Sequence, residues 1–476
     1  MTINDWLYYM FQTLYLISAL GMIGILISEN RNPVKSLAWI LVILFIPFIG
    51  IIIYLFFGQD YTKQRMITRR GMKQLFNRLH TGAIGVQSDE SKVCERFQSL
   101  VKLLNHHQYS PLYDGNSVTY FTNGESKMEN LHNDIKRAKN YIYIEYYIIE
   151  DDDIGNRFAE DLILKAKEGL KIVFIYDDVG CWKVPKSFFK KMEIAGIELI
   201  RFLPVKFQLL TSKVNYRNHR KMVIIDGDIA YMGGMNIANR YVRGIQNGIW
   251  RDTDIRIEGP AILGLQKQFL IDRYFSIKEI PCGPFQYKIP EQKGNTLIQI
   301  VGDGPFGVFH PIHKGYIKAI SSARNYIYIQ TPYFLPTESL LIALQTAAQS
   351  GVDVRIMLPR KSDVILAHHA SRSYIREILH AGIKVYFYNP GFLHAKMMVI
   401  DDYLTVVGSA NIDFRSFEHN FELSAFIYDG QETKKFKSVF LNDQKDCKKI
   451  TLNIWDKYPL KKRFINSLLR LFSPLL

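Results

Sequence analysis

The sequence predicts an α/β protein in which one structural unit occurs twice in tandem, behind two hydrophobic helices at the N-terminus. Two observations carry this prediction. Two long uncharged runs lie within the first 60 residues, and three short segments downstream recur in the same order at nearly constant spacing. The first observation predicts a membrane anchor, and the second predicts a duplicated globular domain.

The composition predicts a large folded protein that meets something anionic. Its 476 residues correspond to roughly three domains. A hydrophobic fraction of 48% is enough for a core and excludes a disordered chain. The four cysteines stand far apart, which argues against a disulfide framework or a cysteine zinc site and favours a reducing compartment. The net charge of +15 indicates nucleic acid or an acidic membrane face as a partner.

The two uncharged runs at the N-terminus predict a membrane anchor over residues 1–60. They cover 23 residues from Trp6 to Ser28 and 21 residues from Leu37 to Phe57, and each exceeds the roughly 20 residues that cross a bilayer. A signal peptide fits poorly because the charged first region is missing and the apolar run is too long. A pair of buried core helices is the less favoured alternative. Pro47 and Gly50 interrupt the second run, so it either spans with a kink or forms a re-entrant hairpin.

Charged residues around these runs predict the orientation of the anchor. Six basic residues lie between Lys63 and Arg78, whereas the loop between the runs holds two, Arg31 and Lys35. Because positive loops stay on the cytoplasmic side, the chain after Phe57 is expected in the cytoplasm. Residues 61–110 are then expected to form a basic linker or cap without a clear period.

Three pairs of matching segments predict that the remainder is a duplication. Each pair consists of a helix end followed by a strand, at offsets of 185, 182 and 186 residues: 138–149 with 323–334, 167–178 with 349–360, and 195–202 with 381–388. This order predicts two α/β units, over residues 111–285 and 286–476, each with a largely parallel sheet.

Each predicted unit ends on the same polar motif. It consists of His-x-Lys, four residues, Asp, six residues and then Gly-Gly/Ser-x-Asn. One His-x-Lys alone is usually an ordinary piece of strand, but two full copies 175 residues apart inside a duplication are a strong signal. The motif residues are His219, Lys221, Asp226 and Asn236 in the first copy, and His394, Lys396, Asp401, Ser409 and Asn411 in the second.

The spacing within the motif predicts a phosphate-transfer site. Histidine and lysine two apart on a strand point to the same side, so two such strands related by a pseudo-twofold axis would bring both pairs to one cleft. Lysine and asparagine donors suit phosphate oxygens, and two imidazoles suit in-line displacement. The lysines could supply the charge that a metal usually brings, so no metal or cofactor is expected. A purely structural role is disfavoured because two buried lysines without an anion would be costly.

The duplicated motif resembles the signature of the phospholipase D superfamily over about residues 110–430. The hydrophobic runs, with the strings RNPVKSLAWILVILFIPFIG and NHRKMVIIDG, make the chain similar to bacterial cardiolipin synthases of the phospholipase D type. The resemblance implies two tandem phospholipase D-like α/β/α repeats in a bacterial cell membrane. It also implies that a histidine takes a phosphatidyl group from phosphatidylglycerol, and that a second phosphatidylglycerol then attacks the phosphohistidine to give cardiolipin.

The resemblance also implies residue roles. His219 would be the nucleophile and His394 the general acid and then base, although the motif symmetry itself does not choose. Lys221 and Lys396 would hold the phosphate, and Asp226 and Asp401 complete the motif set, bracing strands and loops. Family members place a carboxylate 25–35 residues after each histidine. This spacing assigns Asp252, with Asp254 as runner-up, to His219 and Glu422 to His394; a plain strand-capping role for Asp252 is the alternative. Gly234 stands where the second copy has Ser409, so the half-sites need not be equivalent.

Two segments could contact lipid. Leu203–Lys213 is either a membrane-dipping lip or a half-buried loop, and the basic amphipathic tail Lys461–Leu476 is either an interfacial helix or packed on the body. Phosphatidylglycerol and anionic lipids are the expected partners. Other acceptors, a membrane-anchored nuclease and a non-catalytic lipid-binding protein remain alternatives. The anchor favours lipid over nucleic acid, and the intact motifs favour catalysis. Protein partners and oligomeric state stay open.

Overall fold

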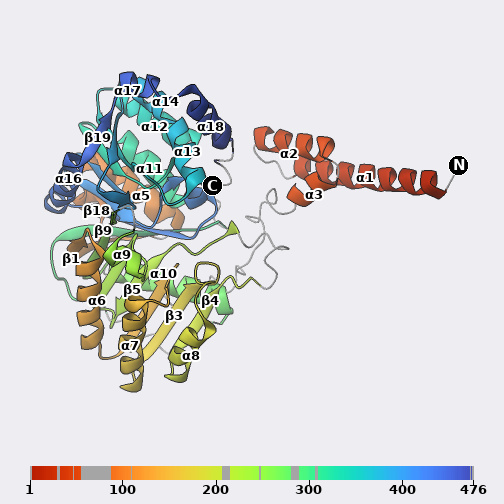
Figure 1. Cartoon of the computed structure of the whole chain (residues 1–476). Helices are drawn as coiled ribbons and strands as arrows, with labels where there is room; N and C mark the ends of the chain where they lie inside the picture. The colour runs from red at the N-terminus through yellow and green to blue at the C-terminus, as the bar shows by residue number, and fades with distance from the viewer. Residues whose placement is uncertain are drawn as a thin grey trace. The chain divides into compact units, whose positions relative to one another are not determined.

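The chain is described here from a computed structural model (Figure 1). Its helices and strands fall into two compact units, Met1–Gln64 with Val205–Asn215, and Arg65–Pro204 with Tyr216–Leu476. The structure describes residues 3–28, 33–46, 48–54, 87–108, 110–205, 215–245, 248–279, 289–305, 309–471 and 473.

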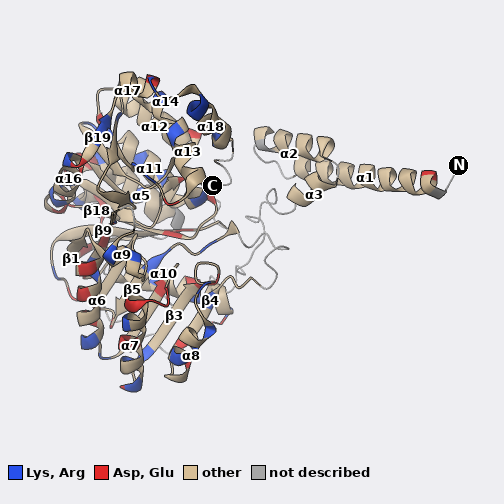
Figure 2. Ribbon diagram, in the orientation of Figure 1, with Lys and Arg blue, Asp and Glu red and all other residues tan. Residues whose placement is uncertain are grey.

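The first unit contains one helix that is long and apolar enough to cross a membrane. Helix α1 (Ile3–Ser28) has 26 residues, which at ~1.5 Å per residue exceeds the thickness of a bilayer core. The second hydrophobic run is divided into α2 (Pro33–Phe45) and α3 (Ile49–Ile53), in line with the interruption expected at Pro47 and Gly50. Figure 2 shows almost no charge on these three helices.

Close contacts explain the division of the second run. A side chain at Gly50 would place its Cβ 2.4 Å from the carbonyl oxygen of Val42, so only glycine allows α3 to approach the end of α2. The Tyr15 hydroxyl of α1 donates to the carbonyl oxygen of Ile43. This bond satisfies one of the carbonyl groups that a helix end leaves open.

The second unit is built on one 15-stranded sheet whose strand order is nearly palindromic. Two half-sheets, repeat 1 and repeat 2, meet at its centre, and one extra strand, β19 (Cys447–Ile450), closes the repeat 2 edge. From the centre outward, repeat 1 runs β1 (Leu112–Phe121), β8 (Asp254–Glu258), β6 (Ile229–Gly233), β5 (Lys221–Ile225), β2 (Tyr141–Tyr146), β3 (Lys171–Asp177) and β4 (Glu198–Phe202). Repeat 2 runs β9 (Thr296–Asp303), β18 (Glu422–Tyr428), β16 (Leu404–Gly408), β15 (Met397–Ile400), β10 (Tyr326–Gln330), β12 (Asp353–Pro359) and β13 (Lys384–Tyr388).

This order confirms the predicted duplication and corrects the predicted strand directions. The central pair β1 and β9 is antiparallel, with Leu112 opposite Gln299, as a pseudo-twofold axis between the repeats requires. Within the 15-stranded sheet, the described parallel pairs are β2–β3–β4 and β10–β12–β13. The sheet is therefore mixed rather than largely parallel. The motif strands β5 and β15 each turn back in a short hairpin onto β6 and β16, which adds antiparallel strands to each repeat.

Helices cover both faces of the sheet, which explains the repeated Tyr-Ile-Tyr-Ile strands. In β2, Ile142 and Ile144 belong to the core shared with α6 (Gly124–Arg137), α7 (Asp153–Lys167) and α8 (Lys186–Ile194). On the other face, Tyr143 stacks on Phe269 of α10 (Ile262–Ile277), with ring centroids 4.8 Å apart. In repeat 2, α16 (Gly430–Lys445) occupies the place of α10. A strand buried on both faces has no polar side.

The part of the predicted linker that is described is a packed element of repeat 2. A 3-10 turn (Glu90–Lys92) leads into α5 (Glu95–Gln108), whose Phe97, Leu100 and Leu104 lie in the core of repeat 2. Residues 61–86 lie outside the described residues. The other helices are α9 (Asn239–Arg243), α11 (Pro311–Ser321), α12 (Glu338–Gln349), α13 (Ile365–Ser373), α14 (Ile375–His380), α15 (Phe414–Glu418), α17 (Leu452–Asp456) and α18 (Leu460–Arg470).

Candidate active site

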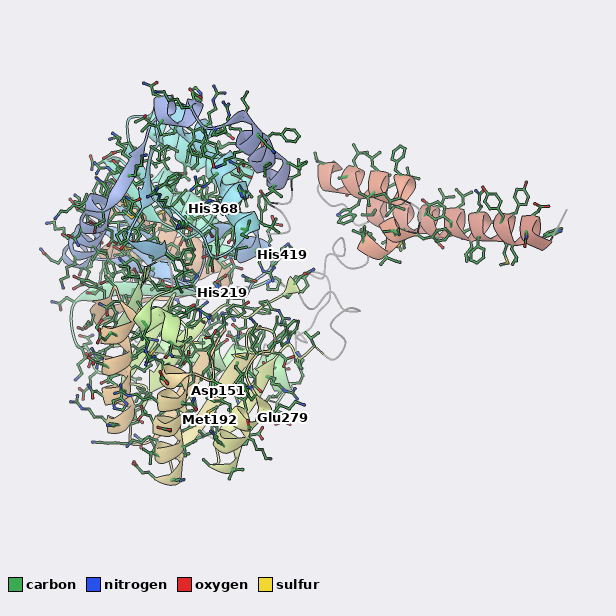
Figure 3. All side chains as sticks on the ribbon, viewed as in Figure 1. Asp151, Met192, His219, Glu279, His368 and His419 are labelled. Atoms are coloured by element: carbon green, nitrogen blue, oxygen red, sulfur yellow. The ribbon has the colours of Figure 1, made fainter. Side chains whose placement is uncertain are left out.

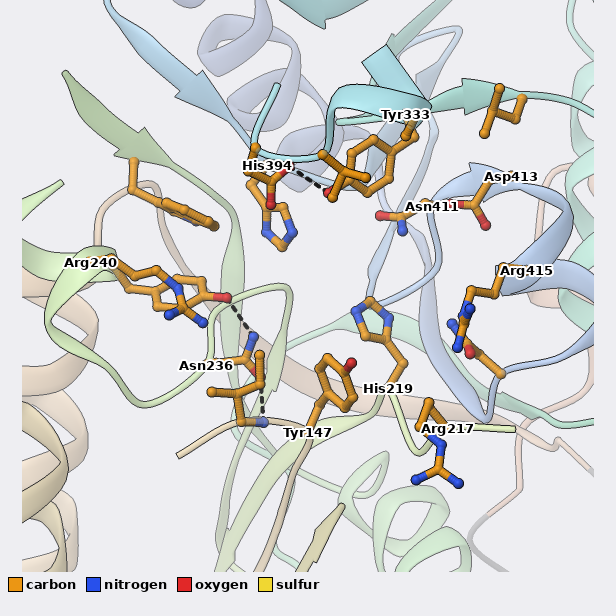
Figure 4. A pocket seen from close by; sticks show the side chains of 18 of the residues that line it. Tyr147, Arg217, His219, Asn236, Arg240, Tyr333, His394, Asn411, Asp413 and Arg415 are labelled. Atoms are coloured by element: carbon orange, nitrogen blue, oxygen red, sulfur yellow. Dashed lines mark hydrogen bonds between the residues drawn. The ribbon is translucent and has the colours of Figure 1, made fainter. Parts of the chain in front are cut away.

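The two motif copies meet at a cavity between the repeats. Its volume is about 570 Å³, and its lining includes His219 and Asn236 from repeat 1 with His394 and Asn411 from repeat 2. Figure 3 places His219 at the junction of the repeats, and Figure 4 shows the two imidazoles on opposite walls. The predicted pseudo-symmetric assembly of one site from two motifs thus agrees with the geometry.

Each histidine is held by a carboxylate of the other repeat. Nδ1 of His219 lies 2.9 Å and 3.1 Å from the two oxygens of Glu422. Nδ1 of His394 lies 2.5 Å from Oδ2 of Asp252. The expected assignments, Asp252 to His219 and Glu422 to His394, are therefore wrong in their partners although both carboxylates belong to the site. Asp254, the runner-up, instead lies 3.6 Å from the ammonium of buried Lys127.

The exchange of partners follows from how the backbone crosses between the repeats. The amide of His219 donates to the carbonyl of Phe421 at 2.9 Å, and the amide of His394 donates to that of Arg251 at 2.7 Å. The short strands β7 (Ile249–Arg251) and β14 (Gly391–Leu393) pair in parallel on the second of these crossings. Each histidine thus lies beside the residue that precedes the other repeat's carboxylate. Distance along the chain cannot reveal this crossing.

These contacts fix the imidazole tautomers. A carboxylate accepts a hydrogen bond, so Nδ1 carries the proton and Nε2 keeps its lone pair. Burial lowers the pKa of His219 to about 4, although Glu422 opposes that shift. Burial also lowers the pKa of His394. Both rings are therefore neutral at neutral pH, which is the form that a nucleophile needs.

The difference between Gly234 and Ser409 matches the difference between the two carboxylates. A Cβ at Gly234 would lie 2.1 Å from Oδ1 of Asp252, so the shorter carboxylate packs directly on the glycine backbone. The hydroxyl of Ser409 donates to the longer Glu422 and accepts the amide of Leu423 at 2.9 Å. The half-sites are therefore built differently, as the sequence allowed.

The two motif lysines lie buried close to the histidines. Nζ of Lys396 lies 2.9 Å from Nδ1 of His394 and 4.0 Å from Asp252. Nζ of Lys221 donates to the carbonyl of His219 and lies 5.4 Å from the ring centroid of Tyr147. Burial lowers the pKa of Lys221 to about 7 and also lowers that of Lys396. An anion bound nearby would favour their charged forms.

Three motif residues hold the backbone, and of these only Asn236 also lines the cavity. Asp226 accepts the amides of Lys139, Asn140 and Tyr141 at 2.7–2.9 Å. Asp401 accepts the equivalent amides of residues 324–326 at 2.6–2.8 Å and pairs with an arginine of α5. Both aspartates belong to the motif, but their contacts are with backbone amides. They therefore brace the strands and loops, as expected, and do not take part in the chemistry. Asn236 is also engaged, since it accepts the amide of Ile148 and donates to Tyr241.

Several residues of the cavity were not singled out from the sequence. An aromatic wall surrounds the histidines: Tyr147 lies 5.1 Å from His219 and Trp250 lies 5.1 Å from His394, between ring centroids. Arg217 and Arg415 also line the cavity. The sequence offered one hint for two of them: Arg217 and Trp250 each stand two residues before a predicted site residue. Residues 206–213 of the expected lip, Leu203–Lys213, lie outside the described residues. Among the described residues, no cluster of histidine, cysteine or acidic side chains could hold a metal.

Comparisons with known proteins identify the family. The family model "Cardiolipin synthase, PLD-like domain" matches residues 131–262 and 316–444, and "Phospholipase_D-nuclease N-terminal" matches residues 14–59. The chain is 38% identical to a cardiolipin synthase of Geobacillus sp. over 94% of this chain and 90% of that protein. The chain belongs to the cardiolipin synthase family. The major cardiolipin synthase of Bacillus subtilis is also 38% identical, over 97% of this chain and 98% of that protein.

Membership of the cardiolipin synthase family makes the chain a phosphatidyltransferase of the phospholipase D superfamily. It confirms the resemblance expected from the duplicated motif. A solved phosphatidylserine synthase of Haemophilus influenzae has the same fold, with a TM-score of 0.61 over 79% of this chain and all of that chain at 12% identity. The cardiolipin synthase relatives and the apolar helix α1 indicate a membrane-associated protein.

Proposed function

We propose that the protein transfers a phosphatidyl group from one phosphatidylglycerol to another, releasing glycerol and forming cardiolipin through a phosphohistidine on His219. The observation that carries the proposal is the pair of imidazoles on one cavity, each with Nδ1 on a buried carboxylate. The choice of lipid substrate rests on the similarity to cardiolipin synthases.

In the first step, Nε2 of His219 attacks the phosphorus, and the bond to the glycerol head group breaks. Glu422 stabilises the positive charge that develops on the His219 ring. His394, which takes up a proton on Nε2 when the anionic phosphodiester binds, gives that proton to the departing glycerol oxygen and becomes neutral. Burial lowers the pKa of His394, and the negative charge of a bound phosphodiester opposes that shift. The nearby ammonium groups of Lys221 and Lys396 offset the charge on the phosphoryl oxygens.

In the second step, the neutral His394 accepts the proton of a head-group hydroxyl of the second phosphatidylglycerol. That oxygen attacks the phosphorus, the phosphorus–nitrogen bond breaks, and His219 regains its lone pair. The reaction consumes one phosphodiester and one alcohol hydroxyl and forms one of each. Its free-energy change is therefore small, and the transfer is reversible. Water, serine or ethanolamine as the acceptor in this step defines the alternative activities.

The direct test uses purified full-length protein in vesicles that contain phosphatidylglycerol as the only lipid substrate. The expected products after thin-layer separation are cardiolipin and free glycerol, and excess glycerol reverses the reaction. Phosphatidic acid as the dominant product at every glycerol concentration would identify a hydrolase instead. A parallel incubation with DNA, expected to leave the DNA intact, addresses the nuclease alternative.

We also place the catalytic unit on the cytoplasmic side of a bacterial cell membrane, with both hydrophobic runs entering the bilayer. The six basic residues between Lys63 and Arg78 support this orientation. Thiol or protease reagents applied outside intact cells should therefore not reach residues after 60. Labelling of those residues from outside would show that the catalytic unit lies on the opposite side of the membrane.

An exposed apolar rim supports approach of the catalytic unit to lipid. Helix α18 packs on α13, where Nδ1 of His369 and Oδ1 of Asn466 lie 2.8 Å apart. Both helices still present apolar side chains to solvent, since Ile365 is 74% exposed and Phe464 is 70% exposed. The neighbouring Val364 lines the cavity. With the basic residues 461–463, this rim suits an anionic bilayer, which supports an interfacial role for a tail that also packs on the body.

A further inference from the structure

The two sides of the cavity differ in chemistry although the backbone repeats. On the wall of His394, the hydroxyl of Tyr333 donates to Oδ1 of Asp363 at 2.7 Å, and both residues line the cavity. Figure 4 shows Tyr333 on the side of His394. At the offsets of 185 and 182 residues that relate the flanking strands, repeat 1 carries Ile148 and Cys181. Neither side chain offers an oxygen.

The Asp363 carboxylate is close to the reacting groups and is available to a ligand. Burial lowers the pKa of both His394 and Lys396, and Asp363 is among the carboxylates that oppose these shifts. Asp363 is exposed. Within the described part of the chain it forms no ion pair, and its hydrogen bonds, from Tyr333 and Ser362, reach only Oδ1.

A carboxylate beside a phenol suits an alcohol with neighbouring hydroxyl groups. The carboxylate accepts hydrogen bonds from hydroxyls, and the phenol oxygen, whose own proton goes to Asp363, can accept one more. The glycerol head group of phosphatidylglycerol carries such a pair. One of its oxygens must also lie within hydrogen-bond reach of Nε2 of His394 to exchange a proton with it.

We propose that Tyr333 and Asp363 form the alcohol subsite of the enzyme and recognise the vicinal hydroxyls of glycerol. The subsite holds the glycerol that departs in the first step and the phosphatidylglycerol head group that enters in the second. The inference rests on the proposed function and deepens it, because it names the residues that prefer a glycerol hydroxyl over other acceptors.

The subsite also assigns the histidine roles that the motif symmetry leaves open. In an in-line displacement, the nucleophile and the alcohol oxygen stand on opposite sides of the phosphorus. An alcohol held beside His394 leaves His219 as the attacking group. The wall of His219 carries Arg217, which pairs with Asp177 at 3.3 Å, and Arg415 instead of a phenol–carboxylate pair.

The test compares two alcohols as acceptors for the full-length protein in phosphatidylglycerol vesicles. Labelled glycerol exchanges into phosphatidylglycerol, whereas 1-propanol, which lacks the second hydroxyl, gives phosphatidylpropanol. Asp363→Ala is expected to lower the preference for glycerol over 1-propanol at least tenfold, because a site built for a hydroxyl loses its discrimination when the partner is removed. Transfer to 1-propanol should fall less than transfer to glycerol, because loss of the Asp363 charge acts on His394 and Lys396 in both reactions, whereas loss of the hydroxyl acceptor affects glycerol alone. Tyr333→Phe should act in the same direction by a smaller factor.

Asp151→Ala serves as the matched control. Asp151 is an exposed carboxylate of repeat 1 that does not line the cavity, and Figure 3 shows it away from His219. Its replacement should change neither acceptor. An unchanged preference in Asp363→Ala, or an equal loss with both alcohols, would overturn the subsite. Absence of any alcohol transfer by the wild type would instead overturn the proposed function, and the subsite with it.

Discussion

Replacing Gly234 by serine makes the first motif identical in pattern to the second, yet it should disable the enzyme. The pattern itself tolerates serine at this position, as Ser409 demonstrates. A Cβ at Gly234 would lie 2.1 Å from Oδ1 and 2.8 Å from Cγ of Asp252. Real Cβ contacts essentially never fall under 3.0 Å, so the carboxylate must move away and leave His394.

The magnitude follows from the contacts that Asp252 makes. Its displacement removes the 2.5 Å contact with His394 and the ion pair with Lys396, while leaving charges buried. Breaking a buried charged pair costs about 3–5 kcal/mol. Loss of a correctly held general acid lowers the rate by about 10²–10⁴-fold. The reverse change, Ser409→Gly, removes hydrogen bonds to Glu422 and Leu423 and should cost about 1–2 kcal/mol without a clash.

The assay measures cardiolipin formation and thermal unfolding for both variants in the same vesicles. Gly234→Ser is expected to lose at least about a hundredfold in rate, and Ser409→Gly is expected to lose much less. A Gly234→Ser enzyme that keeps more than about a tenth of wild-type activity would refute the reasoning, because a misplaced Asp252 cannot be neutral.

Three further predictions concern protonation, the rim and metals. Burial holds the pKa of Lys221 at about 7 against 10.5, so the unfolded chain binds more protons between these values and stability should rise with pH there; Lys221→Met should flatten this rise in thermal unfolding, and an unchanged slope would contradict it. Ile365→Glu and Phe464→Glu should lower transfer from bilayer phosphatidylglycerol but not from a monomeric short-chain analogue. Ile194→Glu, at a similarly exposed position (77%) on α8, is the control that should change neither, and equal losses with both substrates would exclude docking. Activity should survive chelation after metal stripping, and complete loss restored by one specific ion would disprove it.

The fold could be predicted where the residue pattern of a single segment is enough to identify its secondary structure. The segments 138–149 and 323–334 revealed the duplication because both became central strands buried on two faces. Helix α5 was missed because its apolar residues 97, 100, 101 and 104 form a narrow stripe inside a polar segment. The break in the second hydrophobic run could be anticipated from Pro47 and Gly50, and the close approach of Gly50 to Val42 is a contact that the sequence does not show.

The site was predictable in its members and not in its pairings. The spacing within the motif selected His219 and His394, since strand geometry is local. The exchange of Asp252 and Glu422 depends on backbone hydrogen bonds between the repeats. The spacing of residues along the sequence does not reveal these bonds. The role of Asp226 could be anticipated because a carboxylate after a strand commonly binds nearby amides. Tyr333 and Asp363 escaped notice because the positions at the matching offsets in repeat 1 are Ile148 and Cys181, so the duplication gave no signal there.

The most direct measurement of the central claim is the location of the phosphatidyl group during turnover. Phosphatidylglycerol labelled at phosphorus is mixed with the full-length protein and quenched in base, and the labelled peptide is identified by mass spectrometry. The account predicts label on His219 that further phosphatidylglycerol converts into cardiolipin, and no label in His219→Ala. Label on His394, or cardiolipin formed without any labelled protein, would contradict the account.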